Sequence, residues 1–192
     1  GLVRVFAFEE QFDEAIRRWD QVVALSKDDA YRQLLARIEI AQLRVRTGNS
    51  KDAITLFDQT LDDVDPDSWL ARDIGRRIEE VFQQTQDPTG LVAYYESRLQ
   101  RRADDLNGLV RLAAALGRAG KPQDALARYR TAVKLAPARR DIREALVREL
   151  VRAGKNSEAI AECEELATRN PDAADLLRML GQLHLDAASP AD

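Results

Sequence analysis

Few residues in this chain are of the types that carry out chemistry. Its 192 residues include one histidine, His184, and one cysteine, Cys163. One histidine cannot make a multi-histidine metal site, and it leaves no second candidate for a Ser–His–acid arrangement. One cysteine excludes an internal disulfide and a thiolate metal cluster. We therefore expect neither an enzyme nor a site for a metal or cofactor, and no small-molecule substrate.

Acidic and glycine-rich segments give no stronger signal of chemistry. Four aspartates gather between positions 62 and 67, but the regular oxygen spacing and the turn glycine of a calcium loop are absent. We interpret Asp65-Pro66 as the start of a helix instead. No glycine-rich phosphate loop occurs in the sequence.

Composition favours a helical protein with a sizeable core. Apolar residues make up 45% of the chain, whereas glycine (9) and proline (6) are sparse. Alanine and unbranched side chains, which lose little freedom in a helix, are abundant. No uncharged apolar run approaches the roughly 18–20 residues that span a bilayer. We expect a soluble protein, with the cytoplasm favoured over the periplasm and the compartment left open.

Charge is distributed unevenly along the chain. The net charge is −4, which argues against a nucleic-acid binder. Residues 98–155, however, carry a net charge of +9, between segments of −7 (residues 1–97) and −6 (residues 156–192). This basic middle region is the compositional feature that could bear on function.

A short sequence pattern recurs along the chain. An alanine appears at positions 15, 53, 125 and 159, and Leu91 fills the gap, so the spacings are 38, 38, 34 and 34 residues. Four residues later comes a larger side chain, at Trp19, Phe57, Tyr95, Tyr129 and Cys163. This spacing places both positions on one apolar stripe of a helix. We interpret Trp19, Tyr129 and Cys163 as core residues, and Cys163 as an inert thiol.

The pattern predicts two alternating sets of helices. Helices that carry the stripe are expected near 12–25, 50–63, 88–102, 122–135 and 156–168. The helices between them are expected near 29–46, 67–86, 105–119, 139–153 and 173–187. The short connections force these helices into antiparallel hairpins.

Local signals mark the ends of the expected helices. Prolines at positions 88 and 122 suit the first residue of a helix, where the missing N–H does no harm. Ser50 and Asn156 are plausible caps. Glycines at positions 48, 120 and 154 suit the left-handed residue that ends the preceding helix.

The alternation of two helices per 34 residues resembles the tetratricopeptide repeat. In residues 106–139 the consensus positions are filled by Leu109, Leu112, Ala113, Leu116, Ala125, Tyr129, Ala132 and Pro137. The resemblance covers nearly the whole chain. It implies an all-α fold, a right-handed α-solenoid built of antiparallel helix hairpins. A HEAT-like or otherwise divergent helical array is the alternative.

The resemblance makes residues 1–187 a single repeat array. The array would comprise a half repeat (1–28), hairpins 29–66, 67–104, 105–138 and 139–171, and a terminal helix (172–187). Residues 188–192 would form a tail or linker. Leu2 and Phe6 fit a first helix, so that Gly1 falls inside a hairpin, and we expect a piece of a longer repeat protein.

Several residues depart from the family pattern. Leu91 and Arg98 replace small residues where paired helices cross, so we expect the hairpin over 67–102 to be splayed or irregular. Arg37, Arg44 and Arg143 stand where bulky apolar residues are usual. The two 38-residue spacings add about one helical turn, which we assign to the first helix of each of those units.

In the family, the first helix of each pair lines a concave face that grips a partner's peptide or helix. By register, the lining here includes Arg76, Asn107, Arg118, Asp141, Glu144, Arg148 and Arg152. One hypothesis is that Arg118, Arg148 and Arg152 accept an acidic segment, because guanidinium groups pair well with carboxylates. The other is a solvated face with Asp141 and Glu144 as local counter-ions. The Lys and Asn with which chaperone-binding members hold a carboxylate are absent, so chaperone-tail binding is not expected.

The resemblance favours a protein–protein interaction scaffold over an enzyme. Two other functions stay open. One is self-association through the end helices, which would make a homo-oligomer, and the other is RNA binding by the basic middle region. We expect part of a bacterial assembly or regulatory protein, and the five lysines against 24 arginines favour a GC-rich genome.

Three further residues have less defined places in the pattern. Trp69 and Tyr94 are not clearly part of a stripe, and Tyr94 could be exposed. His184 falls at the family's tyrosine position on the last helix, so we expect it to be a partly buried packing residue.

Overall fold

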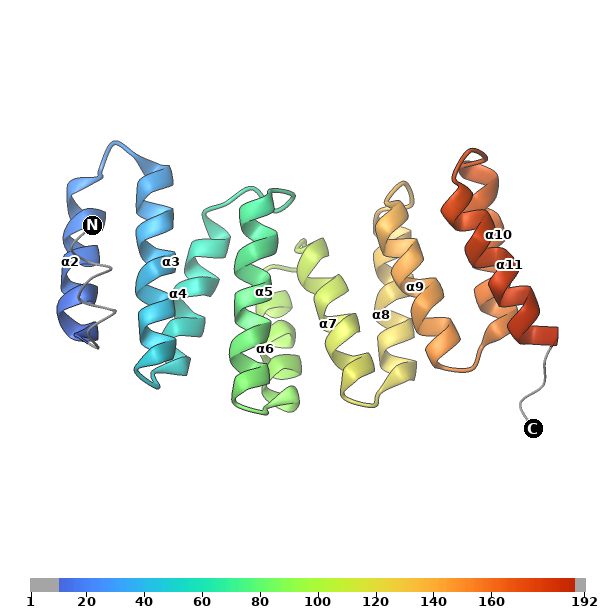
Figure 1. The fold of residues 1–192 in the computed structure, drawn as a ribbon, viewed down its shortest axis with the longest axis horizontal. Coiled ribbons are helices and arrows are strands. Elements are labelled where there is room, and N and C mark those ends of the chain that lie inside the picture. Colours follow the sequence, from blue (N-terminus) through green and yellow to red (C-terminus); the bar gives the residue numbers. More distant parts are fainter. Residues whose placement is uncertain (1–10, 189–192) are drawn as a thin grey trace. The chain divides into compact units, whose positions relative to one another are not determined.

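The computed structural model describes residues 11–188, and every regular element in this range is a helix (Figure 1). The expected all-α class of helix hairpins is confirmed. Predictions for residues 1–10 and 189–192, including Leu2, Phe6 and most of the tail, lie outside the described residues. The chain divides into two compact units, residues 1–87 and 88–192, each described here by itself. The predicted 67–104 hairpin is shared between the units, and its packing stays a prediction.

The first unit contains four described helices. They are α2 (Phe12–Leu25), α3 (Ala30–Arg46), α4 (Ser50–Asp62) and α5 (Trp69–Gln84). Each packs against the next along the chain. The short connections leave consecutive helices antiparallel (Figure 1).

The second unit continues the alternation. Its helices are α6 (Pro88–Arg101), α7 (Leu106–Arg118), α8 (Pro122–Leu135), α9 (Arg140–Arg152), α10 (Asn156–Arg169) and α11 (Ala174–Ala188). Each helix again packs against the next. Figure 1 shows α7, α9 and α11 along one side of this unit, with α8 and α10 behind them. The helix boundaries match the sequence prediction to within two residues.

The predicted helix ends are partly confirmed. Helices α6 and α8 begin at Pro88 and Pro122, and the glycines at 48, 120 and 154 have φ of +80°, +74° and +71°. The predicted caps were wrong, because Ser50 and Asn156 are themselves the first helical residues.

The predicted start of α5 at Asp65-Pro66 was also wrong. The Asp65 carboxylate accepts a hydrogen bond from the Asp67 N–H at 2.8 Å, which closes a turn before the helix. Helix α5 begins instead after Ser68, whose hydroxyl oxygen accepts the Ala71 N–H at 3.1 Å. Ser68 thereby satisfies one of the N–H groups left without an intrahelical partner.

Small side chains allow the paired helices to approach closely. Ala53, Ala125 and Ala159, from the recurring sequence position, are all 0% exposed. In the second unit one apolar cluster contains Ala113, Leu126, Tyr129, Leu146, Val147, Leu150, Ala159, Cys163 and Leu183. Because this cluster contains residues of α7 through α11, the core of the unit is shared between neighbouring hairpins. Trp19, interpreted as a core residue, is only half-buried.

The two 38-residue spacings correspond to longer first helices. Helix α3 has 17 residues and α5 has 16, whereas α7 and α9 have 13 each. The added residues stand at the beginning of α3 and α5. The prediction that the 38-residue spacing lengthens the first helix is confirmed.

Arginines replace apolar packing residues by forming cross-helix ion pairs. Arg143 is 7% exposed, and its Nη1 lies 2.7 Å from Glu162 and 2.9 Å from Glu165 on α10. Two pairs in the first unit join α3 to α4 and its end: Arg37–Asp63 at 2.5 Å and Arg44–Asp52 at 3.8 Å. The aliphatic stems pack in the hairpin while the charged heads find partners.

Arg98, at a position where the family has a small residue, ties α6 to α7. Its side chain is 4% exposed, and its Nε donates to Asp105 Oδ2 at 2.5 Å. The second oxygen, Asp105 Oδ1, accepts the N–H of Gly108 at 2.7 Å and caps α7. One largely buried carboxylate therefore pairs with the guanidinium and caps the start of α7.

Replacing Arg98 should lower the stability of the fold. Arg98→Ala leaves Asp105 buried without its guanidinium, and breaking such a pair costs about 3–5 kcal/mol. Urea unfolding should show this loss, whereas Arg128→Ala, at an exposed position on α8, should change stability little. Equal unfolding midpoints for the two variants would contradict the role assigned to Arg98.

Candidate partner-binding face

The predicted site residues lie on first helices of both units. Arg76 is on α5 of the first unit, and all the others lie on α7 and α9 of the second. Asn107 is half-buried near the start of α7, and Arg118 is exposed at its end. Arg76 pairs within its own helix, with Asp73 at 2.6 Å and with Glu80, so it belongs to a separate network.

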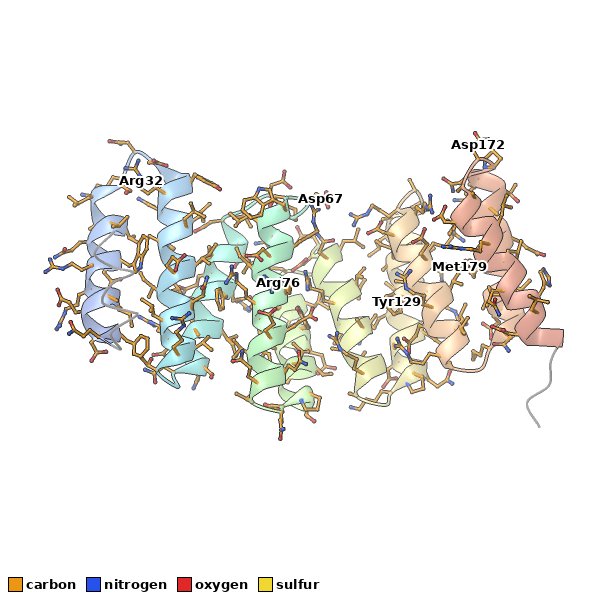
Figure 2. All side chains as sticks on the ribbon, in the orientation of Figure 1. Arg32, Asp67, Arg76, Tyr129, Asp172 and Met179 are labelled. Atoms are coloured by element: carbon orange, nitrogen blue, oxygen red, sulfur yellow. The ribbon has the colours of Figure 1, made fainter. Side chains whose placement is uncertain are left out.

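Tyr129 of the second unit is a buried phenol in a charged environment. Tyr129, on α8, is 5% exposed, and burial followed by the carboxylate of Glu149 raises its pKa above the ordinary value. The positive charges of Arg148, Arg152 and Arg118 lower that pKa. Glu149 itself lies against Gly117 of α7 and pairs with Arg152 of α9, so these two first helices approach one another here. Figure 2 shows Tyr129 in the second unit.

Carboxylates on α9 pair with part of this arginine group. Arg152 Nη1 lies 2.5 Å from Glu149 Oε2, and Arg148 Nη1 lies 3.7 Å from Glu144 Oε2. The side chains of Arg148 and Arg152 are each 58% exposed, so both guanidiniums remain open to solvent. Glu144 thus serves as a counter-ion to Arg148, as one of the two sequence hypotheses holds.

A second ion-pair group lies nearer the start of α9. Asp141 pairs with Arg139 at 2.8 Å, and this hydrogen bond lowers the pKa of Asp141. Arg140 Nε lies 2.6 Å from Glu144, which raises the pKa of Arg140, and Arg140 also pairs with Asp175 on α11. Asp141 is therefore a counter-ion to Arg139 rather than to the three arginines around Tyr129.

Sequence reasoning missed the most unusual residue of this face, Glu149. Its side chain is 2% exposed, and Oε1 has no hydrogen-bond partner. The equivalent positions on the other first helices, ten residues before the recurring small position, are apolar: Leu43, Val81 and Ala115. A Cβ on Gly117 of α7 would lie 2.7 Å from Glu149 Oε1, so the glycine makes room for the carboxylate. A charged residue at an otherwise apolar repeat position is the sequence signal that could have found it.

The remaining candidates for chemistry have structural places. Cys163 is 0% exposed, and burial raises the pKa of its thiol, so the prediction of an inert core residue is confirmed. His184 was expected to be partly buried but is 55% exposed, 3.9 Å from Glu164. The reason is that no helix follows α11 among the described residues to cover that side. Tyr94 is half-buried, with its ring 4.9 Å from that of Tyr95.

Two further features of residues 11–188 bear on function. No group of three or more His, Cys, Asp or Glu side chains in this part of the chain is arranged to hold a metal ion. None of its helices combines the length and the apolar character that a bilayer crossing requires.

Stacked antiparallel hairpins with an exposed first-helix face define the class of helical-repeat interaction scaffolds. Models of the tetratricopeptide repeat match residues 1–68 and 116–183. The chain therefore belongs to the tetratricopeptide repeat family, which resolves the HEAT-like alternative. Proteins of this family are scaffolds for protein–protein interaction, and this chain is one of them.

Solved structures of similar fold are distant in sequence. YrrB, a TPR protein with an unusual peptide-binding site, is 14% identical, with a TM-score of 0.53 over 92% of this chain and 87% of its own. MamA from Desulfovibrio magneticus RS-1 is 16% identical, with a TM-score of 0.54 over 90% and 93%. A tetratricopeptide repeat protein from Parabacteroides merdae is 10% identical, with a TM-score of 0.56 over 95% and 70%. Such identities support the fold alone. No curated protein matches the chain.

Replacing Glu149 should stabilise the second unit. Glu149→Leu restores the apolar character of this repeat position and removes a buried oxygen without a partner, worth about 1–3 kcal/mol. The urea midpoint should rise, whereas Glu96→Leu, at an exposed position on α6, should leave it unchanged. A lower midpoint for Glu149→Leu would mean that the carboxylate stabilises the fold.

Proposed function

We propose that the second unit binds an acidic segment of a partner protein on the face formed by α7 and α9. Arg118, Arg148 and Arg152 provide the charge. The observation that carries the proposal is the place of Glu149, which pairs with Arg152 at 2.5 Å and lies against Gly117, the residue before Arg118. This contact supports convergence of side chains from two successive hairpins. The surrounding segment, residues 98–155, has a net charge of +9, which would draw an acidic partner toward it.

The chemistry of guanidinium groups suits this role. Each can hold a carboxylate through two parallel hydrogen bonds, a geometry that lysine cannot offer. The existing pair between Arg148 and Glu144 is long, at 3.7 Å, and the Arg148 side chain is 58% exposed, so exchanging Glu144 for a partner's carboxylate costs little. The half-buried amide of Asn107 could hydrogen-bond to the backbone of an extended segment.

Glu149 holds Arg152, one of the three arginines of this face, in place. Its Oε2 lies 2.5 Å from Arg152 Nη1, and its own burial leaves it little freedom to move. A guanidinium held in place before binding loses less conformational entropy when a partner arrives. The buried carboxylate therefore supports affinity even though it lowers stability.

The likeness to YrrB supports recognition of a peptide, because that protein has the same fold and an unusual peptide-binding site. Self-association is a second candidate, favoured by an uncovered apolar side of α11. Leu177 and Leu185 are 53% and 64% exposed, and nothing lies within 4 Å of a Cβ built on Gly181 between them. Light scattering over a range of concentrations distinguishes this candidate, since only self-association makes the mass depend on concentration.

Charge reversal on the face tests the proposal directly. Arg118→Glu, Arg148→Glu and Arg152→Glu are combined in one variant, and a fluorescent peptide rich in glutamate is titrated against it. Charge-assisted hydrogen bonds contribute about 1.5–3 kcal/mol each, so affinity should fall at least a hundredfold. The salt dependence of wild-type binding should be lost as well.

A matched control separates the site from general attraction. Lys121→Glu, Arg128→Glu and Lys134→Glu change the same net charge at exposed positions at the start of and along α8. This control should weaken binding only a few-fold. Equal losses in both variants, or no binding by the unmodified chain, would contradict the proposal. Tighter binding of an RNA oligonucleotide than of the peptide would favour the RNA alternative.

A further inference from the structure

The extra turns at the starts of α3 and α5 carry a repeated feature. The first helices α7 and α9 begin nineteen residues before their recurring small positions, Ala125 and Ala159. Helices α3 and α5 begin about one turn earlier relative to Ala53 and Leu91. The added turns are therefore not needed to build a hairpin of this type.

Each added turn presents one exposed aromatic side chain. Tyr31 and Trp69 both stand 22 residues before the recurring position, so they are equivalent in the repeat. Their exposed fractions are 54% and 59%, whereas the aromatic residues of the stripe, Phe57 and Tyr95, are each 1% exposed. A single surface aromatic is common, but two at equivalent places in two inserted turns form a pattern.

Carboxylates accompany both aromatic rings. Asp29 and Asp67 each precede their aromatic residue by two positions, in Asp29-Ala30-Tyr31 and Asp67-Ser68-Trp69. The connection that leads into α5, residues 63–68, contains three aspartates and no lysine or arginine. Figure 2 shows Arg32, which follows Tyr31 in the sequence, and Asp67 at the same edge of the first unit. The edge thus combines ring faces with negative charge.

We infer that this edge of the first unit is a second interaction surface, which takes a partner segment bearing two arginine side chains, one on Tyr31 and one on Trp69. A guanidinium stacks on an aromatic face by cation–π attraction while it pairs with a neighbouring carboxylate. Leu35, one turn after Tyr31 and 37% exposed, extends the apolar surface for the aliphatic stem of arginine. Charge complementarity selects this occupant, because residues 1–87, the first unit, carry a net charge of −6.

Basic side chains of the chain itself already contact these aspartates, so a partner's arginine must compete with them. Arg32 pairs with Asp29 at 3.3 Å, with both side chains largely exposed, and Arg72 donates to the Asp67 carbonyl oxygen at 2.7 Å. Exposed pairs of this kind contribute little, so an incoming guanidinium can replace Arg32 at Asp29. This surface has the opposite charge from the arginine face of the second unit, and the inference does not depend on that face.

The chain carries its own probe for the test. A Trp19→Phe background leaves Trp69 as the only tryptophan, so its emission reports on this edge alone. The ligands are Gly/Ser peptides with two arginines at separations of two to eight residues. Matched peptides replace both arginines by norleucine or by glutamate. Affinities are measured by anisotropy of labelled peptide on the full chain, and Leu25→Ala, 86% exposed in the same unit, is the control variant.

The expected results follow from the strength of exposed cation–π contacts. The arginine peptide should shift Trp69 emission, and Trp69→Ala and Tyr31→Ala should each weaken binding about three- to fivefold. The double variant should weaken it about tenfold or more, Trp69→Phe should retain most of the affinity, and Leu25→Ala should change nothing. Unchanged affinity in Trp69→Ala and Tyr31→Ala would overturn the inference. So would equal binding of the norleucine peptide, or no binding of the arginine peptide.

Discussion

The close approach of two helices at a small side chain is the constraint on which the hairpins that contain Ala53, Ala125 and Ala159 depend. Ala53, Ala125 and Ala159 are fully buried, and the larger residues one turn away fill the space around the crossing. An apolar stripe on a single helix cannot be sheltered from water by that helix alone. The stripe is buried only when the next helix lies against it, so each unit gains stability from contacts between neighbours.

The same constraint positions the side chains of the arginine face. Tyr129 belongs to the apolar cluster of the second unit, to which α7 and α9 also contribute residues. Core packing therefore positions α7 and α9, the helices that carry Arg118, Arg148 and Arg152. Among the buried charged side chains, Arg98 and Arg143 have ion-pair partners, whereas one carboxylate oxygen of Glu149 has no hydrogen-bond partner.

Sequence alone predicted the helices well because their signals are local. Apolar spacing and turn glycines such as Gly120 act within one or two helical turns, and they set the helix boundaries and the buried place of Cys163. What failed depends on contacts that no local pattern encodes. The space beside Gly117 that accommodates Glu149 lies between residues of two different hairpins. The exposure of His184 depends on how α11 packs against other helices. The convergence of the site residues stays a hypothesis, because it depends on how side chains of two different hairpins approach one another.

Substitution at a crossing position tests this account most directly. Ala125→Leu inserts three extra carbon atoms where α7 and α8 approach, and overpacking of this kind costs about 1–3 kcal/mol. Ala127→Leu, two residues away and exposed on α8, is the matched control. Thermal unfolding followed by circular dichroism should show a lower midpoint for Ala125→Leu and an unchanged midpoint for Ala127→Leu. Equal midpoints for both variants would contradict the claim that close helix crossing at small residues holds the repeats together.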